Sequence, residues 1–210
     1  QTEAVSNLSP QAAGALYYAT RLHDAERSAD LSNRFCEAPF VKFETLIDGT
    51  VAPCCSIWTK QRLGHLDHQS FDEIWNSAGA QAMRESILDG SYRYCNKSRC
   101  TLITEDALPE RDAIQDPELR RVIDGGITEM TAGPRWLFLA HDVTCNLACP
   151  SCRSELIGAV EEQQARFQKI EENVFRPLFQ SEGEVRLSIS GQGDPWSSPH
   201  YRSILRYMAD

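Results

Sequence analysis

The sequence lacks the features that several common classes of protein require. It contains no run of about 18 apolar residues, so no membrane-spanning helix is expected. Basic residues are outnumbered, 21 Lys and Arg against 30 Asp and Glu, and the formal charge of −9 disfavours binding to a nucleic-acid backbone. The sequence has no glycine-rich phosphate-binding loop and no nucleophile elbow. We therefore expect neither a nucleic acid nor a membrane as a partner.

Cysteine, by contrast, is present in two separate groups. The first half of the chain contains Cys36, Cys54, Cys55, Cys95 and Cys100, and the second half contains Cys145, Cys149 and Cys152. Two odd-numbered groups do not divide neatly into disulfides, and disulfide scaffolds are usually shorter and denser in cysteine. The grouping favours metal ligation in a reducing cytoplasm.

The second half of the chain alternates between strand and helix patterns. An apolar run of strand length at 135–141 precedes the three cysteines, and a helix is expected over 154–179, ended or kinked by Pro177. A second strand at 184–190 and a second helix at 200–208 follow. This order predicts a right-handed parallel crossover, with the cysteine loop at the carboxyl end of the first strand.

The spacing of the second cysteine group is specific. Cys145, Cys149 and Cys152 are separated by three and then two residues, whereas a tetrahedral zinc site would need a fourth ligand. The spacing, the preceding strand and the following helix together resemble the cluster motif of the radical S-adenosylmethionine superfamily. The resemblance implies that the three thiolates hold a [4Fe–4S] cluster whose fourth iron binds S-adenosylmethionine. The alternative reading is a zinc knuckle that borrows a ligand such as His141.

The loop after the second strand fits the same resemblance. Residues 188–199 read SISGQGDPWSSP and lie where that superfamily has a Gly-Gly-Glu-Pro-like segment, which implies cofactor binding by Ser190, Gly191, Gly193, Asp194 and Pro195. By itself such a stretch is most often only a turn. It gains significance because ligand sites of parallel α/β folds lie at this edge of the sheet.

The first half predicts a small cysteine-rich unit. Strands at 41–47 and 51–55 form a hairpin turned at Asp48-Gly49, and a helix is expected over 70–90, begun by a Ser70/Glu73 capping box and ended at Gly90. Cys36, a hairpin glycine and Cys54, followed by Cys95 and Cys100, resemble the auxiliary-cluster modules called twitch or SPASM. The resemblance implies an auxiliary [4Fe–4S] cluster held by Cys36, Cys54, Cys95 and Cys100. Cys55 in place of Cys54, or zinc in place of iron, are the alternatives.

These readings combine into one expected organisation, in which an N-terminal helical segment (1–34) and a twitch/SPASM-like module (35–132) precede the start of a barrel (133–210). The expected fold class is α/β: a small α+β cysteine-rich module, hairpin plus helix, followed by the beginning of a partial (β/α)6 TIM-like barrel. The chain starts at Gln1, and the 58 residues after Cys152 are too few for six strand–helix units of about 30 residues each. We therefore expect a piece of a longer protein, or a barrel completed by another chain.

The resemblance implies a cytoplasmic enzyme that cleaves S-adenosylmethionine reductively to a 5′-deoxyadenosyl radical, which takes a hydrogen atom from its substrate. A peptide, a sugar or another small metabolite is the expected substrate, and flavodoxin or ferredoxin the expected electron donor. The alternatives are a non-catalytic iron–sulfur electron-transfer or scaffold module and a zinc-binding interaction domain. His200 is expected to be solvated.

Overall fold

The computed structural model describes residues 30–152, 154–180, 184–189 and 193–209. Most of the expected N-terminal helical segment (1–34) therefore lies outside the described residues, as do the sequence-predicted residues Ser190 and Gly191. The strands are β1 (Lys42–Thr45), β2 (Thr50–Ala52), β3 (Gly64–His65), β4 (Trp136–Leu139) and β5 (Arg186–Ile189). The helical elements are α2 (Ala38–Val41), α3 (Phe71–Trp75), α4 (Ala78–Leu88), α5 (Thr101–Thr104), η1 (Arg111–Ala113), α6 (Pro117–Gly125), α7 (Glu161–Ile170), η2 (Glu171–Phe175), α8 (Arg176–Phe179) and α9 (Pro199–Ala209).

All five described strands belong to one sheet, in the order β3-β2-β1-β4-β5. The hairpin strands β1 and β2 are antiparallel, as the sequence predicts, and β4 and β5 are parallel. The α/β class is thus confirmed. The sheet also contains a pairing that the sequence did not indicate, because β1 of the cysteine-rich module lies parallel to β4. Among the described strands the order is linear, and the TIM-like barrel remains a prediction.

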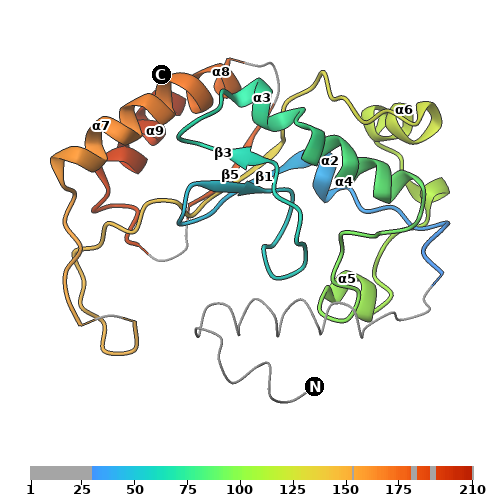
Figure 1. Cartoon of the computed structure of the whole chain (residues 1–210), viewed down its shortest axis with the longest axis horizontal. Helices are drawn as coiled ribbons and strands as arrows, with labels where there is room; N and C mark the ends of the chain where they lie inside the picture. The colour runs from blue at the N-terminus through green and yellow to red at the C-terminus, as the bar shows by residue number, and fades with distance from the viewer. Residues whose placement is uncertain (1–29, 153, 181–183, 190–192, 210) are drawn as a thin grey trace, which may run out of the picture.

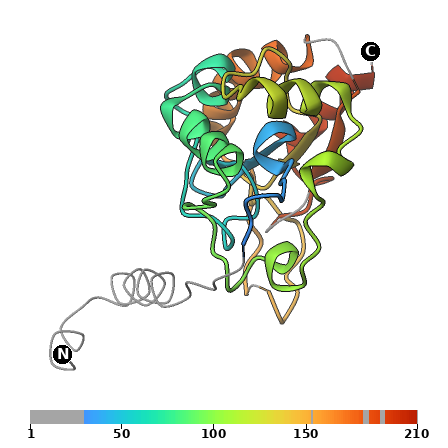
Figure 2. The ribbon, with the colours of Figure 1, turned by 90° about the vertical axis from the view of Figure 1, so that its right-hand side faces the viewer.

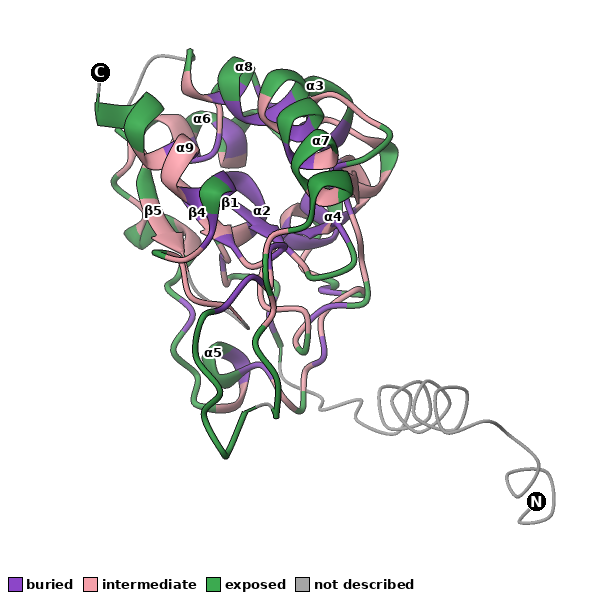
Figure 3. Cartoon of the chain, turned by 90° about the vertical axis from the view of Figure 1, so that its left-hand side faces the viewer, coloured by how far each residue is buried: buried purple, intermediate pink, exposed green. Residues whose placement is uncertain are grey.

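The sheet separates a helical layer from a layer of loops. In Figures 1 and 2 the longer helices lie on one side of the sheet, and the α5 region and the loop after β4 extend from the other side. Phe43 faces the helical layer, where its ring lies 6.0 Å from that of Phe71 on α3. Lys42 and Trp136 face the loops, since both line a cavity there. Figure 3 shows buried residues along the sheet and exposed ones on the projecting loops.

The helix expected over 70–90 is divided into two. Ser70 and Glu73 form the predicted capping box at the start of α3, and Gly90 takes a left-handed conformation with φ +76°. The chain leaves the helix at Asn76, and the hydroxyl of Ser77 then accepts a hydrogen bond from the amide of Ala80 to start α4. A second capping residue therefore begins a second helix, since a serine side chain at this position satisfies a free amide of the new first turn.

The helix expected over 154–179 begins later than predicted, at Glu161. Before it, Ile157 forms an isolated β-bridge with Cys145 instead of joining the helix. Pro177 neither ends nor breaks the helical segment. The π-helical turn η2 (Glu171–Phe175) directly precedes α8, which contains Pro177. Such turns accommodate the backbone hydrogen bond that a proline cannot donate.

No helix among the described residues is both long enough and apolar enough to cross a bilayer.

Candidate functional site

The five cysteines of the first half surround one cavity. Its volume is about 450 Å³, and its remaining lining is largely apolar, including Phe35, Met83, Trp58 and Trp136. All five are free thiols, and Cys100 is buried while the others are half-buried. Within the described ranges, no three His, Cys, Asp or Glu side chains form a group that could hold a single metal ion. The thiols surround the cavity without converging on one point.

Short connections bring these cysteines together. Cys36 lies just before α2, Cys54 follows β2 by two residues, and Cys100 is the N-cap residue of α5. Cys95 is held against the turn after β2, because Thr59 and Cys95 form an isolated β-bridge. Predicted ligands that are 64 residues apart in the sequence therefore line the same cavity.

Burial controls the ionisation of these thiols. It raises the pKa of Cys36 to about 12, and the charge of Cys100 adds to this effect. Burial also raises the pKa of Cys54 and Cys95 well above the ordinary value, and each is raised further by charge on neighbouring cysteines. Four thiolates could not coexist here without a positive group, and iron ligation supplies one.

Cys54 and Cys55 are the two candidates for one ligand position. Charge on Cys36, Cys95 and Cys100 raises the pKa of the Cys54 thiol. Charge on Cys55 raises the pKa of Cys100. Both residues line the cavity. Both residues are therefore placed to join the other three thiols.

Residues 36–101 match the SPASM family, an iron–sulfur cluster-binding domain. The match begins at Cys36 and ends one residue after Cys100, so it includes all five cysteines that line the cavity. The chain therefore carries a SPASM-type module, and the match implies iron–sulfur cluster binding by this segment. The donor set agrees, since thiolates are the usual ligands of such clusters. No curated protein and no solved structure matches the chain.

The second cysteine group lies in a closed loop after β4. Cys145 is buried, and its backbone exchanges two hydrogen bonds with Ile157, of 2.8 and 3.0 Å. Cys149 and Cys152 are exposed, and the amide of Cys152 donates to the carbonyl of Cys149 over 2.9 Å in a tight turn. The loop is therefore fixed at its base and presents two of its thiols on the surface.

The loop after β5 contacts the base of the cysteine loop. The amide of Asp194 donates to the carbonyl of Thr144 over 2.9 Å, and the hydroxyl of Ser197 donates to the same oxygen over 3.2 Å. Gly193 lies against the same backbone, where a Cβ atom would meet the carbonyl oxygens of Thr144 and Asp142 at 2.7 and 2.8 Å. Asp194 and Pro195 are half-buried beside it. Only glycine allows this approach.

Replacing Gly193 with alanine should therefore destabilise the protein. The added methyl group must displace backbone atoms, and overpacking of this kind costs about 1–3 kcal/mol. Gly158→Ala is the matched control, since nothing lies within 4 Å of its Cβ position. Urea denaturation should show a lower midpoint for Gly193→Ala and no loss for Gly158→Ala. Equal midpoints would contradict the close approach.

A buried polar chain, missed by the sequence analysis, supports the same loop from the helical side. Nδ1 of His141 lies 2.8 Å from the hydroxyl of Thr45, and its Nε2 lies 2.7 Å from Nε2 of His200. Nδ1 of His200 in turn lies 2.8 Å from a carboxylate oxygen of Glu171. The expectation that His200 is solvated was wrong, because Phe167 on α7 stacks on its ring at 4.4 Å. Only the packing of α7 against α9 creates this burial.

The residue after His141 anchors the loop itself. The carboxylate of Asp142 accepts hydrogen bonds from the amide and hydroxyl of Thr144, at 2.8 and 2.7 Å, and from the hydroxyl of Ser198 at 2.6 Å. The hydroxyl of Tyr201 accepts from the amide of Asp142 over 2.8 Å. Residues of α9 and its N-terminal turn thus fix the segment that leads into Cys145.

The buried histidines should make the fold sensitive to acid. Burial, together with the charges of His200 and Arg166, holds the pKa of His141 well below 6.5. Burial alone would raise the pKa of Glu171, but hydrogen bonds from His200 and Ser203 and nearby positive charge outweigh it and lower that pKa below 4.5. As the pH falls below about 6.5, the unfolded chain therefore takes up a proton at His141 that the folded chain excludes. The free energy of unfolding should then fall by up to about 1.4 kcal/mol per pH unit, with a further loss below pH 4.5 from Glu171.

Urea unfolding at several values between pH 7.5 and pH 5.5, under anaerobic reducing conditions, measures this loss. His141→Gln should flatten the profile, whereas His68→Gln, which alters an exposed histidine, should leave it unchanged. A wild-type profile that is level across this interval would contradict the assignment.

Proposed function

We propose that this chain performs radical S-adenosylmethionine chemistry with two [4Fe–4S] clusters. Cys145, Cys149 and Cys152 would hold the cluster that binds S-adenosylmethionine, and Cys36, Cys54, Cys95 and Cys100 would hold the auxiliary cluster of the SPASM-type module. With its cofactor bound, the first cluster supplies one-electron reductive cleavage of the sulfonium. The residues of the chain bind, orient and shield the reacting groups.

The contact between the two loops carries this proposal. A three-cysteine loop and a Gly-Asp-Pro loop follow adjacent parallel strands, and they meet through Gly193 and the hydrogen bond from Asp194 to Thr144. A loop that approaches the cysteine segment so closely is well placed to offer backbone groups to a ligand held there. We assign the amino group of S-adenosylmethionine to the loop formed by Ser190, Gly191, Gly193, Asp194 and Pro195.

Both cysteine groups lie next to strands of the same sheet. Strand β1 begins near the five-cysteine cavity and ends at Thr45, whose hydroxyl accepts a hydrogen bond from the amide of Ala140 at the start of the other cysteine loop. The sheet face between them carries a buried ion pair, with Nζ of Lys42 2.6 Å from a Glu44 oxygen and 4.5 Å from the centre of the Trp136 ring. We propose that the substrate, a peptide, sugar or other small metabolite, lies toward this face. Flavodoxin or ferredoxin would supply electrons in the cytoplasm.

Electron paramagnetic resonance on the anaerobically reconstituted protein tests the proposal. The reduced wild-type chain should give a [4Fe–4S] signal that changes when S-adenosylmethionine is added. The Cys145→Ala, Cys149→Ala, Cys152→Ala triple variant should retain an auxiliary-cluster signal that the cofactor leaves unchanged.

Two other outcomes would overturn the proposal. An iron signal that S-adenosylmethionine never alters would identify an electron-transfer or scaffold module. Stoichiometric zinc without iron would identify a zinc-binding interaction domain.

A further inference from the structure

Tyr92, a lining residue of the five-cysteine cavity, has an unexplained hydroxyl group. The residue is 1% exposed and lines the cavity, yet its buried hydroxyl has no hydrogen-bond partner. A tyrosine hydroxyl keeps its proton at neutral pH, so this group is available as a hydrogen-bond donor. Leaving a buried donor without a partner is unfavourable, so each such group calls for a partner.

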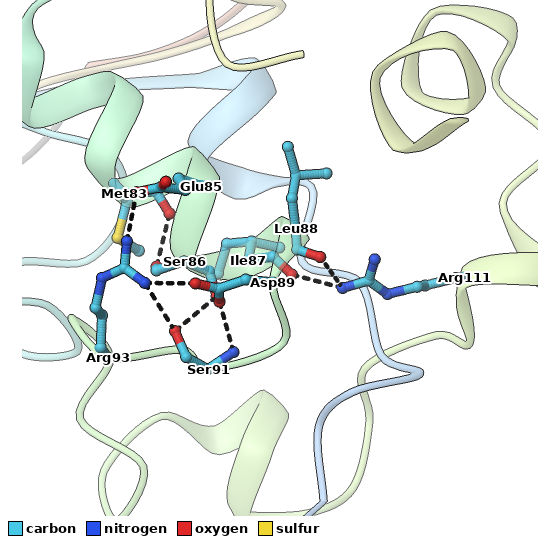
Figure 4. A network of polar contacts seen from close by, with 9 residues as sticks. All are labelled: Met83, Glu85, Ser86, Ile87, Leu88, Asp89, Ser91, Arg93 and Arg111. Carbon is cyan, nitrogen blue, oxygen red and sulfur yellow. Dashed lines mark hydrogen bonds and ion pairs between the residues drawn. The ribbon is translucent and has the colours of Figure 1, made fainter. Parts of the chain in front are cut away.

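The backbone holds Tyr92 in this position at some cost. Its φ of +49° lies in the left-handed region, which residues other than glycine, asparagine and aspartate seldom adopt. The amide of Tyr92 donates to the carbonyl of Ser86 over 2.8 Å, immediately after α4. The guanidinium group of the next residue, Arg93, donates hydrogen bonds to Asp89, Glu85 and Ser91. These bonds connect the turn to the end of α4 (Figure 4). Strain of this kind typically persists at ligand sites, where the surrounding contacts enforce it.

Arg111 is a positively charged residue whose charge acts on the Tyr92 hydroxyl. Its Nη2 donates to the carbonyls of Ile87 and Leu88, at 2.7 and 2.8 Å, and closes the end of α4 (Figure 4). Its charge favours the more negative form of the Tyr92 hydroxyl.

We propose that the Tyr92 hydroxyl donates a hydrogen bond to a sulfur atom of the iron–sulfur group held by Cys36, Cys54, Cys95 and Cys100, and thereby raises its reduction potential. This inference rests on the proposed auxiliary cluster. Sulfur is the acceptor that the cavity offers, and hydrogen bonds to the sulfurs are among the factors that set such potentials. Reduction adds negative charge to the group, so a donor stabilises the reduced state more than the oxidised one.

The test uses the full chain carrying the Cys145→Ala, Cys149→Ala, Cys152→Ala substitutions, so that only the auxiliary cluster is observed. Tyr92→Phe removes the hydroxyl and keeps the ring, and Tyr94→Phe is the matched control two residues away. Iron and acid-labile sulfide should be equal in all three proteins. In Tyr92→Phe, the equilibrium constant for one-electron reduction should fall about tenfold, as expected for the loss of one charge-assisted hydrogen bond. This is a midpoint potential about 59 mV lower, measured by potentiometric titration with paramagnetic resonance.

The outcomes separate this inference from the proposed function. If the parent protein binds no iron–sulfur cluster, the proposed function fails. If Tyr92→Phe holds a full cluster at the potential of Tyr94→Phe, the inference fails and the function stands. Should Tyr92→Phe not fold, the parent chain labelled with 3-fluorotyrosine keeps every ring and carries a more acidic hydroxyl. Its reduction potential should be higher than that of the unlabelled parent chain. The same rise is expected in labelled Tyr94→Phe, which lacks the hydroxyl of residue 94, and an unchanged potential would overturn the inference.

Discussion

Replacing Cys149 with alanine should abolish reductive cleavage of S-adenosylmethionine. Losing a residue that only supports a metal ligand typically lowers metal affinity or activity 10- to 100-fold. Losing the ligand itself should therefore lower the cleavage rate at least about 100-fold. Cys149 is exposed on the loop closed by Cys145 and Ile157, so its substitution should leave the fold intact. The measurement is chromatographic detection of 5′-deoxyadenosine and methionine after anaerobic incubation with dithionite.

Cys55→Ala is the control for this experiment, because it removes a thiol from the other cysteine group and leaves the proposed ligands in place. It should cleave the cofactor at the wild-type rate. Circular dichroism should show that both variants are folded. Undiminished cleavage in Cys149→Ala would exclude the three-cysteine loop as the cofactor-binding cluster site.

Replacing Cys54 with alanine should remove the auxiliary cluster and destabilise the SPASM-type module. The cavity of about 450 Å³ would lose one of its four proposed cluster ligands. The remaining cysteines would stay buried, where a charged thiolate is unfavourable without bound iron. Metal binding and folding are coupled in small metal-binding units, so loss of the cluster should lower the unfolding temperature. Bound iron should fall by about four atoms per chain, as measured by colorimetric iron and sulfide assays.

The adjacent cysteine again provides the matched control. Cys55→Ala should retain the full iron content, because charge on Cys36, Cys95 and Cys100 acts on Cys54. If instead Cys55→Ala loses the iron and Cys54→Ala keeps it, the assignment of the two residues is reversed. Equal retention in both would indicate that either thiol can complete the site.

Signals that depend on neighbouring residues were readable from the sequence. The capping box of Ser70 and Glu73 and the left-handed Gly90 are where the pattern places them, because each acts within one turn of the chain. The hairpin turned at Gly49 and the parallel pairing of β4 with β5 also follow from local patterns and chain order. The cysteine spacing of the first half agrees with the SPASM match.

Features that depend on distant segments were not readable in this way. The helix predicted from residue 154 starts at Glu161 because Ile157 pairs with Cys145, and a backbone pairing leaves no periodic signal. His200 is buried because α7 lies over it, although a single histidine in a polar stretch usually indicates exposure. The parallel pairing of β1 with β4 joins segments about ninety residues apart.

The sequence by itself determined the chemistry available to this protein: two groups of thiols, the spacing within each, and the turns and caps that begin and end its local elements. These follow from residue type and short-range geometry. Only the tertiary structure decided that Tyr92 lines one cavity with the five cysteines of the first half and that Gly193 contacts the base of the cysteine loop. It also decided that one sheet carries both groups, because strand pairing and burial arise from contacts between segments far apart in the chain.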